Sequence, residues 1–296
     1  MIKVIVFGAG GQVGQALKAS KWPVGWRLRF LDRRACDLND RMAIRTIIER
    51  YRPALIVNAA AYTAVDQAES DRQAAWSINA TAVQAMAEAA VAAGAALVHF
   101  STDYVFDGRS QRPWREADTI GPLNFYGASK AAGELAIQAW LTRHLIVRTG
   151  WVYGGSGRNF VNTMLKLGQS REHLSVVDDQ WGRPTVARDL APAVIAAAQS
   201  ALENDSAWGT YHLTNGGPPT TWARLAQTIF GTVQYRQRTV PTIEPVASID
   251  YPTAARRPLN SVLDNRTAER TFGIRLRPWQ DALAESLRAP QQVNAA

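Results

Sequence analysis

The fold is decided by one stretch near the start of the chain, Ile2-Lys3-Val4-Ile5-Val6-Phe7-Gly8-Ala9-Gly10-Gly11-Gln12-Val13-Gly14-Gln15-Ala16-Leu17. Residues 2–7 are mostly apolar and β-branched, which is typical of a buried parallel strand. Glycine at positions 8, 11 and 14 then leads into a predicted helix. This order is the context of a dinucleotide-binding turn. The glycines allow a tight turn and a close approach to pyrophosphate, and the helix N-terminus faces the negative charge.

The end of the second predicted strand bears on which dinucleotide binds. This strand covers residues 27–31 and is followed by Asp32. An acid here can accept hydrogen bonds from the adenosine ribose hydroxyls, which favours NAD. Arg33 and Arg34 come next and can hold a 2′-phosphate, which favours NADP, or can simply belong to a solvated loop. We therefore expect a nicotinamide cofactor, with NADH and NADPH both open.

Strands and helices alternate through the rest of the first half. Further strands are expected at 55–58, 95–100 and 145–148, and helices at 71–93 and 123–140. Ligands of an open parallel sheet bind beyond the carboxyl ends of its strands, where the glycine turn, Asn58, Thr102 and the loop after Arg148 fall. Right-handed connections place helices on both faces. We predict an α/β fold built on a Rossmann-type doubly wound parallel sheet.

The second half of the chain is less regular and predicts a smaller C-terminal lobe. We expect residues 1–150 to form the NAD(P)-binding domain and residues 151–296 to form mainly a substrate-binding lobe. A segment at about 186–214 is expected to return to the main sheet. It contains a predicted helix at 188–199 and a short predicted strand at 210–213.

A tyrosine and a lysine lie one helical turn apart in Tyr126-Gly-Ala-Ser-Lys130. The i, i+4 spacing puts both on one face of a helix. A free tyrosine has a pKa of about 10, and a nearby cation lowers it, which would make Tyr126 a usable acid–base group. Thr102, at a predicted strand end, can hold a substrate oxygen against the phenol. The pair alone is a weak pattern and can also be a chance surface pair, so its context carries the prediction.

Composition excludes several classes of protein. A single cysteine, Cys36, excludes an internal disulfide framework. The net charge is +8, but the arginines are scattered and form no basic run, so we expect no nucleic acid partner. No apolar stretch is long enough to span a membrane, and no signal segment opens the chain, so we expect a cytoplasmic protein. The histidines have no metal-ligand spacing and are interpreted as structural: His99, His144, His173 and His212.

Several motifs together resemble the extended short-chain dehydrogenase/reductase superfamily and, in more detail, the family of dTDP-4-dehydrorhamnose reductases. The coarser resemblance rests on the glycine turn, Thr102 and the Tyr126/Lys130 pair. The finer one rests on strings that run in order over nearly the whole chain, namely residues 8–14, 58–66, 101–108, 126–130, 179–185 and 257–258.

The resemblance implies reduction of the C4 ketone of dTDP-4-dehydro-β-L-rhamnose by NADPH or NADH, in dTDP-L-rhamnose synthesis for cell-surface polysaccharide. Tyr126 would protonate the substrate oxygen, Lys130 would hold the nicotinamide ribose, and Thr102 would bind the C4 oxygen. The expected cofactor contacts are Gly8, Gly11, Gln12, Val13, Asp32, Arg33, Asp37, Leu38, Ala60, Ala61, Tyr62, Thr63, Tyr126 and Lys130. The expected substrate contacts are Thr102, Asp103, Trp151 and Arg257, with Arg256 as the alternative to Arg257 for the diphosphate.

Two departures from related patterns matter. Nucleotide-sugar dehydratases of the superfamily carry a Thr-Asp-Glu run, whereas this chain has Tyr104 in place of the glutamate, which favours simple carbonyl reduction. Some members of the family bind Mg²⁺ at a dimer interface through glutamates. Ala16 and Arg188 fall at two of those positions, although Asp189 is adjacent, so we expect no metal and either a monomer or a homodimer.

Two other functions stay open at this point. One is a nucleotide-sugar epimerase on the same scaffold, which would retain its nicotinamide and consume none. The other is a non-catalytic NADP-binding regulatory subunit, a role found in the same family, although such a protein need not keep Thr102, Tyr126 and Lys130.

Overall fold

The computed structural model describes residues 1–155, 157–232 and 240–288, and within them the main sheet has six parallel strands. Their order across the sheet is β10-β5-β4-β3-β1-β2. The strands are β1 (Ile2–Phe7), β2 (Trp26–Leu31), β3 (Leu55–Asn58), β4 (Ala96–Thr102), β5 (His144–Thr149) and β10 (Gly209–His212). The predicted Rossmann-type parallel sheet is confirmed, and each predicted strand lies within one or two residues of its observed bounds.

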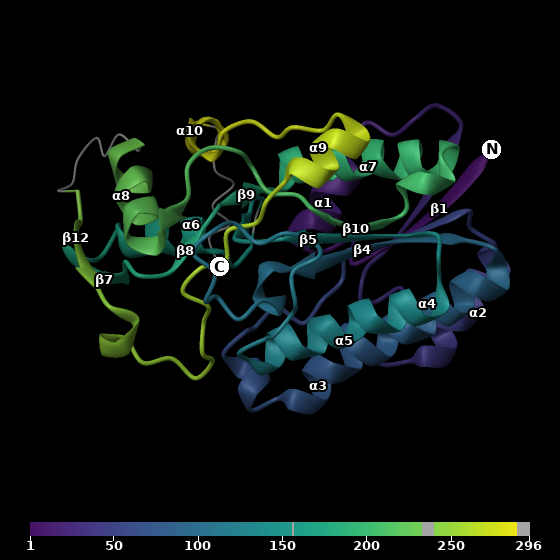
Figure 1. The fold of residues 1–296 in the computed structure, drawn as a ribbon, viewed down its shortest axis with the longest axis horizontal. Coiled ribbons are helices and arrows are strands. Elements are labelled where there is room, and N and C mark those ends of the chain that lie inside the picture. Colours follow the sequence, from purple (N-terminus) through teal and green to yellow (C-terminus); the bar gives the residue numbers. More distant parts are fainter. Residues whose placement is uncertain (156, 233–239, 289–296) are drawn as a thin grey trace.

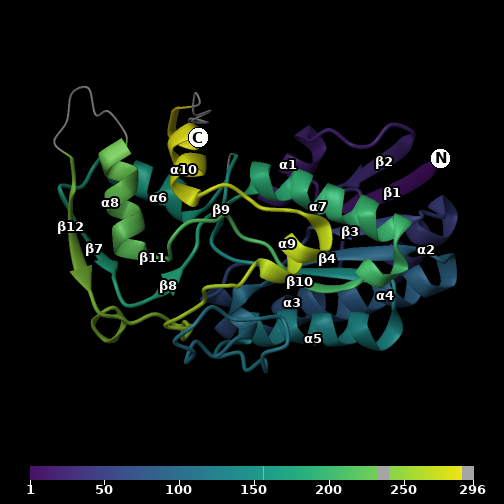
Figure 2. The same cartoon turned by 45° about the horizontal axis from the view of Figure 1, so that its top comes forward.

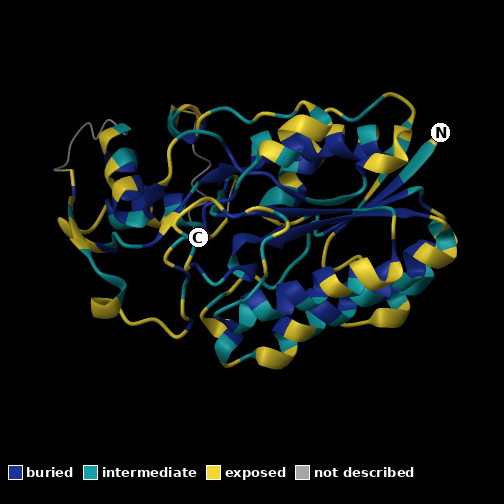
Figure 3. Cartoon of the chain, in the orientation of Figure 1, coloured by how far each residue is buried: buried dark blue, intermediate teal, exposed yellow. Residues whose placement is uncertain are grey.

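Helices cover both faces of this sheet (Figure 1). One face carries α1 (Gln12–Ala19) and α7 (Ala187–Glu203). The other carries α2 (Arg41–Tyr51), α4 (Ala82–Ala93) and α5 (Phe125–Trp140). The four inner strands are largely apolar because both of their faces are buried, as the dark strands of Figure 3 show, whereas the edge strand β2 exposes Arg27 and Arg29.

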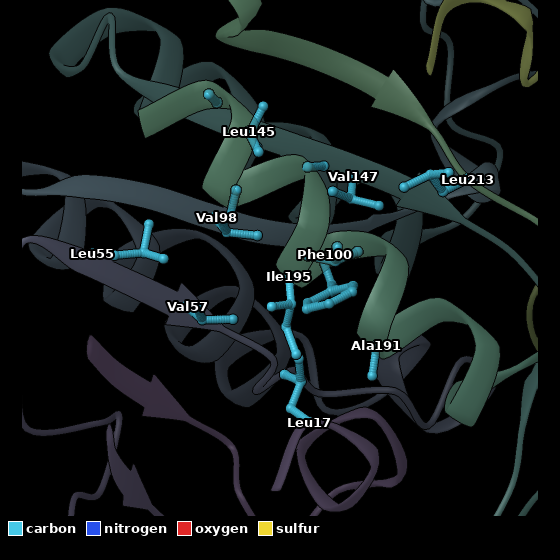
Figure 4. Close-up of a cluster of buried hydrophobic side chains, with 14 of the residues drawn as sticks. Leu17, Leu55, Val57, Val98, Phe100, Leu145, Val147, Ala191, Ile195 and Leu213 are labelled. Carbon is cyan, nitrogen blue, oxygen red and sulfur yellow. The ribbon is translucent and has the colours of Figure 1, made fainter. Parts of the chain in front are cut away.

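The core under α7 joins segments that are far apart in the sequence. Ile195 and Ala191 of α7 and Leu17 of α1 lie against the strand residues Val57 and Val98 (Figure 4). All five side chains are buried. Helix α7 is therefore part of the main sheet's core, although it follows more than thirty residues after β5.

The long helix predicted at 71–93 is interrupted. It consists of α3 (Arg72–Trp76), a π-helical turn at Ser77–Thr81, and α4. Asn79 in the π-helical turn accepts a hydrogen bond from the Tyr62 backbone at 2.9 Å and donates to the Ser129 hydroxyl at 3.0 Å. A Cβ on Gly133 of α5 would lie 2.3 Å from the Asn79 carbonyl oxygen, so α5 packs closely against this turn. The π-helical turn thus ties the loop after β3 to α5.

A smaller lobe lies beyond the carboxyl ends of the main strands (Figures 1 and 2). Its elements are α6 (Phe160–Leu167), β7 (His173–Val177), α8 (Trp222–Thr232), β12 (Thr242–Val246) and α10 (Trp279–Arg288), together with the two-residue strands β6 (Val152–Tyr153), β8 (Trp181–Gly182), β9 (Thr185–Val186) and β11 (Thr220–Thr221). β7 and β12 pair in parallel, and the lobe has its own apolar core. The predicted lobe runs to residue 296, and its last residues lie outside the described ranges.

Between parts of this lobe the chain returns to the main sheet. α7 follows β9, and β10 then pairs in parallel with β5. The predicted helix at 188–199 and the predicted strand at 210–213 correspond to α7 and β10. Within the described ranges, no helix is long and apolar enough to cross a bilayer.

Candidate active site

The glycine turn joins β1 to α1 in a conformation that only small residues allow. Gly8 has a φ of +84°, and a Cβ on it would lie 2.5 Å from the Ala60 backbone nitrogen. A Cβ on Gly14 would lie 2.0 Å from the Gly8 carbonyl oxygen. α1 begins at Gln12 after Gly11, which gives it no side-chain cap. The first amides of α1 are thus left to bind an anion, so the residues present fit a dinucleotide pyrophosphate.

The loop after β2 lies beside this turn, because the amides of Gly8 and Ala9 donate to the Leu31 carbonyl oxygen. Asp32 is exposed, and its Oδ1 accepts the backbone N–H groups of Arg34 and Ala35 at 3.0 and 2.9 Å. The Arg33 and Arg34 side chains are also exposed. Both the acid and the guanidinium groups stand at the strand end, so the geometry keeps NADH and NADPH open.

Two further predicted cofactor contacts lie in the same loop. Asp37 is exposed, and its Oδ1 accepts the Asn39 backbone N–H at 3.0 Å. Leu38 is buried in the core under α2. Leu38 therefore offers its backbone and little of its side chain to a ligand.

The loop after β3 is fixed at both ends. The Ala60 backbone N–H donates to Asn58 Oδ1 at 3.1 Å. Two residues on, the Tyr62 hydroxyl donates to Asp71 at 3.2 Å. Ala60, Ala61 and Tyr62 are partly exposed, and Thr63 is exposed. This loop of small residues lies against Gly8 and can line the cofactor site.

Thr102 and Tyr126 meet at the carboxyl edge of the sheet. Thr102 ends β4, and its hydroxyl donates to Asp103 Oδ1 at 3.0 Å. Tyr126 lies in the first turn of α5, where Asn124 caps the helix by accepting the Gly127 N–H at 2.8 Å. Burial raises the pKa of Tyr126 to about 12, a hydrogen bond with Thr102 opposes this rise, and the Asp103 charge adds to it.

In this structure the causes of the raised Tyr126 pKa do not include Lys130, so a lowering of that pKa by Lys130 stays a prediction. The Lys130 Nζ lies 3.1 Å from His99 Nε2 and donates to the Phe100 carbonyl oxygen at 2.6 Å, so both of these partners are on β4. Burial lowers the pKa of Lys130 to about 8, against an opposing effect of Glu134. The i, i+4 spacing correctly placed the tyrosine and the lysine on one helix face, but it could not predict the hydrogen-bond partners of the lysine amine on β4.

Behind Lys130 lies a buried ion pair. Glu134, one turn further along α5, accepts hydrogen bonds from Arg148 of β5 at 2.7 and 3.0 Å. The Ser101 hydroxyl also donates to Glu134. Both charged side chains are buried, and they compensate each other. The pair supports β4, β5 and α5 directly under the site.

Asp103 is buried beside Thr102 and carries an unsatisfied oxygen. Among the described residues, its Oδ2 has no hydrogen-bond partner. A Cβ on Gly150 would lie 2.5 Å from this oxygen, so glycine is needed there. Burial raises the pKa of Asp103 to about 6, although hydrogen bonds with Ser261 and Thr102 oppose the rise.

Trp151 follows Gly150 and faces the smaller lobe. Its φ of 52° is in the left-handed region, which is uncommon for a large side chain. A Cβ on Gly182 would lie 2.3 Å from the Trp151 ring. The ring stacks on Trp222 of α8. The contacts with Gly182 and Trp222 therefore fix the Trp151 ring against the smaller lobe, close to Asp103.

Arg257 comes to the same edge from the C-terminal part of the chain. It forms two hydrogen bonds with Asp66, at 3.0 and 2.6 Å. Burial lowers the pKa of Arg257, but its interactions with Asp66 and Tyr104 outweigh burial and raise it. The Tyr104 ring meets the Tyr126 ring edge to face, with 6.1 Å between centroids. The Arg256 side chain is exposed, whereas that of Arg257 is partly buried at this edge, which favours Arg257 for the diphosphate.

Several residues of this site were missed from the sequence. They are His99 beside Lys130, Glu134 and Arg148 beneath it, Trp222 against Trp151, and Asp66 on Arg257, while Asn58 was placed at the sheet edge but not as the partner of His99. Glu134 had a local signal, because it lies four residues after Lys130 on the same helix face. The others are long-range contacts without a local signal. In the part of the chain that the structure describes, no group of three or more histidine, cysteine, aspartate or glutamate side chains could hold a metal ion.

A parallel sheet with an uncapped glycine turn, and with Thr102, Tyr126 and Lys130 at its carboxyl edge, defines a nicotinamide-dependent oxidoreductase of the short-chain dehydrogenase/reductase type. Comparison with known proteins narrows the class. The model of the family described as RmlD substrate binding domain matches residues 2–292. The chain belongs to this family, whose curated members include the dTDP-4-dehydrorhamnose reductases.

Individual relatives agree over nearly their full length. The dTDP-4-dehydrorhamnose reductase of Salmonella typhimurium is 44% identical over 285 residues, which cover 94% of this chain and 95% of the relative. A Bacillus subtilis relative, named a spore coat polysaccharide biosynthesis protein, is 38% identical, with 97% of each chain covered. The crystal structure of dTDP-4-dehydrorhamnose reductase from Bacillus anthracis in complex with NADP superposes with a TM-score of 0.89 at 35% identity, covering 96% of this chain and 98% of that one.

Proposed function

We propose that the protein reduces the C4 ketone of dTDP-4-dehydro-β-L-rhamnose to give dTDP-β-L-rhamnose, using NADPH or NADH. The observation that carries this proposal is that Thr102 at the end of β4 and Tyr126 in the first turn of α5 lie at the same sheet edge as the uncapped glycine turn. The names of the curated relatives supply the substrate, and the B. subtilis relative supports a role in cell-surface polysaccharide synthesis.

The cofactor would be held by groups at the ends of β1, β2 and β3. The turn at Gly8 and Gly11, with the first amides of α1 at Gln12 and Val13, would bind the pyrophosphate. Asp32 or Arg33 would contact the adenosine ribose, with Asp37 and Leu38 beside it, and the loop from Ala60 to Thr63 would lie along the dinucleotide. When bound, the reduced nicotinamide supplies the hydride.

The proton comes from Tyr126. Because its pKa is raised, the phenol keeps its proton at neutral pH and is in the form that a reduction needs. Thr102 would turn its single hydroxyl proton from Asp103 Oδ1 to the carbonyl oxygen and so hold that oxygen against the phenol. As negative charge develops on that oxygen, it becomes basic enough to take the phenolic proton. A Lys130 ammonium would then stabilise the phenolate that remains.

The substrate would lie between the sheet edge and the smaller lobe. Trp151 presents an aromatic face, Asp103 borders Thr102, and Arg257 is the candidate for the diphosphate. Tyr104 stands where a dehydratase would carry a carboxylate, and its pKa is raised, chiefly by burial, so it does not offer the base that elimination needs. We place the protein in the cytoplasm as a monomer or homodimer, with a nucleotide sugar as its ligand.

The test is NAD(P)H oxidation with dTDP-4-dehydrorhamnose made in situ, comparing the wild type with Tyr126→Phe. Oxidation and dTDP-rhamnose formation by the wild type, with a loss of roughly a hundredfold or more in the variant, are expected. No oxidation above that of the variant would exclude the reductase. An epimerase would interconvert nucleotide sugars without consuming NAD(P)H, and a regulatory subunit would bind NADP without turnover.

A further inference from the structure

A chain of four hydrogen bonds, three of them buried, connects β3 to α5 through β4. The Ala60 backbone N–H donates to Asn58 Oδ1 at 3.1 Å, and Asn58 Nδ2 lies 3.0 Å from His99 Nδ1. His99 Nε2 lies 3.1 Å from the Lys130 Nζ, which donates to the Phe100 carbonyl oxygen at 2.6 Å. Asn58 and His99 are fully buried, and Lys130 is 1% exposed. None of these groups can therefore exchange its partner for bulk water.

The first link of this chain fixes the tautomer of His99. A backbone N–H can only donate, so the amide oxygen of Asn58 has to face Ala60. The amide nitrogen of Asn58 then faces His99, and it too can only donate. His99 Nδ1 must therefore accept, which leaves the imidazole proton on Nε2. Burial, and then the Lys130 charge, holds the pKa of His99 well below its usual range, so the ring is neutral.

The Nε2 proton points at the Lys130 nitrogen. A lysine ammonium has three N–H donors and no lone pair, so it cannot accept a hydrogen bond. A neutral amine can accept from His99 and still donate to the Phe100 carbonyl oxygen. The contact at 3.1 Å therefore matches the neutral amine, and a protonated Lys130 would set two donors against each other.

We propose that Asn58 and His99 are positioning residues for Lys130, which keep its neutral amine on β4 and turn its ammonium toward Tyr126. When the amine takes up a proton from solvent, it loses the hydrogen bond from His99. The ammonium keeps the Phe100 carbonyl oxygen as an acceptor and turns its remaining N–H groups away from His99, toward the face of α5 that also carries Tyr126. This inference rests on the proposed function, because it explains how Lys130 reaches its place in the reduction.

Several other ionisable groups affect the protonation of Lys130 and Tyr126. Glu134 is the charged group on α5 that favours the ammonium, and Arg148 of β5 largely neutralises it through the ion pair. On the sheet side, Asp103 follows β4 and acts on Tyr126. Burial brings the pKa of Lys130 to about 8, so both forms are available near physiological pH.

The direct test is to observe the two protonation states by NMR in the protein without substrate. Long-range ¹H–¹⁵N spectra show which nitrogen of a histidine carries the proton, and a His99→Phe variant assigns the signal of His99. A ¹³C-labelled lysine titration gives the midpoint of Lys130. We expect the His99 proton on Nε2 at pH 9, where Lys130 is neutral. A proton on Nδ1 there would overturn the proposal.

The Asn58→Asp variant should reverse the direction of the hydrogen bond between His99 and Lys130. Both of its side-chain oxygens accept, so Ala60 keeps its partner while His99 must carry its proton on Nδ1. The Nε2 lone pair can then accept from an ammonium. We expect the histidine tautomer to change and the midpoint of the Lys130 titration to rise by about one pH unit or more. An unchanged tautomer in the folded variant would contradict the inference.

Asn79→Asp is the matched control. Asn79 is another buried asparagine that touches α5, through Ser129, but it does not touch His99. It adds the same negative charge, so it can raise the Lys130 midpoint, but it should leave His99 protonated on Nε2. If it changes the tautomer as Asn58→Asp does, charge alone is responsible and the positioning role is wrong.

These readouts separate the inference from the proposed function. In an active reductase, the alkaline decline of kcat/KM should follow the Lys130 midpoint and shift upward in Asn58→Asp. If the tautomer is as expected but no NAD(P)H is oxidised, the proposed function fails and the inference stands. If the enzyme is active and His99 carries its proton on Nδ1, the inference alone fails.

Discussion

The indole rings of Trp151 and Trp222 lie face to face, with 3.4 Å between their centroids and 5° between their planes. Trp151 follows the last strand before the smaller lobe, and Trp222 is the first residue of α8 within that lobe. The stack thus connects the sheet edge to the lobe through two large aromatic surfaces. It also supports the left-handed backbone of Trp151, which a side chain of that size rarely adopts.

Removing the stacking partner should therefore loosen the substrate site. For Trp222→Ala we expect the KM for the nucleotide sugar to rise roughly three- to tenfold, which corresponds to the energy of one aromatic pair. The kcat should change less, because Thr102 and Tyr126 are untouched. Trp222→Phe retains an aromatic face and should remain close to the wild type. Equal KM values for the alanine variant and the wild type would show that Trp151 does not depend on the stack.

Replacing Asp103 by asparagine should change how stability depends on pH. Its folded pKa is about 6, above the ordinary value of 3.8. Stability from this protonated carboxyl is therefore complete below the unfolded pKa and is lost as pH rises through 6. The loss is roughly 3 kcal/mol by pH 8. Urea unfolding from pH 4 to 8 should show that the free energy of unfolding of Asp103→Asn rises relative to that of the wild type as the pH increases. A constant difference between the two proteins would contradict the raised pKa.

Arg257 and Asp66 make a discriminating pair of variants. If the guanidinium binds the substrate diphosphate, Arg257→Gln should raise the KM for the nucleotide sugar by roughly tenfold or more. Asp66→Asn weakens the competing partner and should leave that KM unchanged or lower it. Steady-state kinetics at saturating cofactor measures both. Equal increases in KM for the two variants would mean that the ion pair serves only to hold the loop.

Arg33 should separate the two cofactors. A guanidinium that holds a 2′-phosphate contributes nothing to NADH binding. We therefore expect Arg33→Ala to raise the KM for NADPH by roughly tenfold and to leave the KM for NADH nearly unchanged. Arg50, an exposed arginine on α2, offers a surface control. Parallel changes for both cofactors would show that Arg33 acts through the loop.

Chelation should leave the reaction intact. Ala16 cannot bind a metal, and Arg188 is itself a cation that pairs with Glu285 of α10 at 3.2 Å. Dialysis against EDTA is expected to leave kcat/KM within twofold, to about the error of such measurements. A large loss that Mg²⁺ restores would show that a metal is required after all.

The strands were predictable because their burial is continuous. Leu55–Asn58 is buried at every position, so an apolar, β-branched run was enough to locate it. The π-helical turn at Ser77–Thr81 was not predictable, because it depends on what Asn79 meets at Tyr62 and Ser129 in the folded chain. In the same way β7 and β12 form their pair across about seventy residues, and β12 is largely exposed.

The candidate site likewise contains residues that the sequence could place and residues that it could not. Thr102, Tyr126 and Lys130 could be placed from local spacing and strand ends, since each lies at an element boundary or on one helix face. The partner of Lys130 could not be placed. His99 reads as an ordinary strand residue, and its contact with Asn58 follows from the pairing of β3 with β4, in which these two residues are direct partners. Strand order and register are not contained in either segment alone.

The position of α7 has a consequence for how this protein is made. Val6, Val57 and Val98 belong to the first hundred residues, but their cover includes Leu190, Val194 and Ile195, which are synthesised much later. A nascent chain whose first half has just left the ribosome still presents one apolar face of its sheet that α1 covers only in part. We therefore expect chains truncated near residue 150 to aggregate, because the α7 side chains that complete this core would be missing.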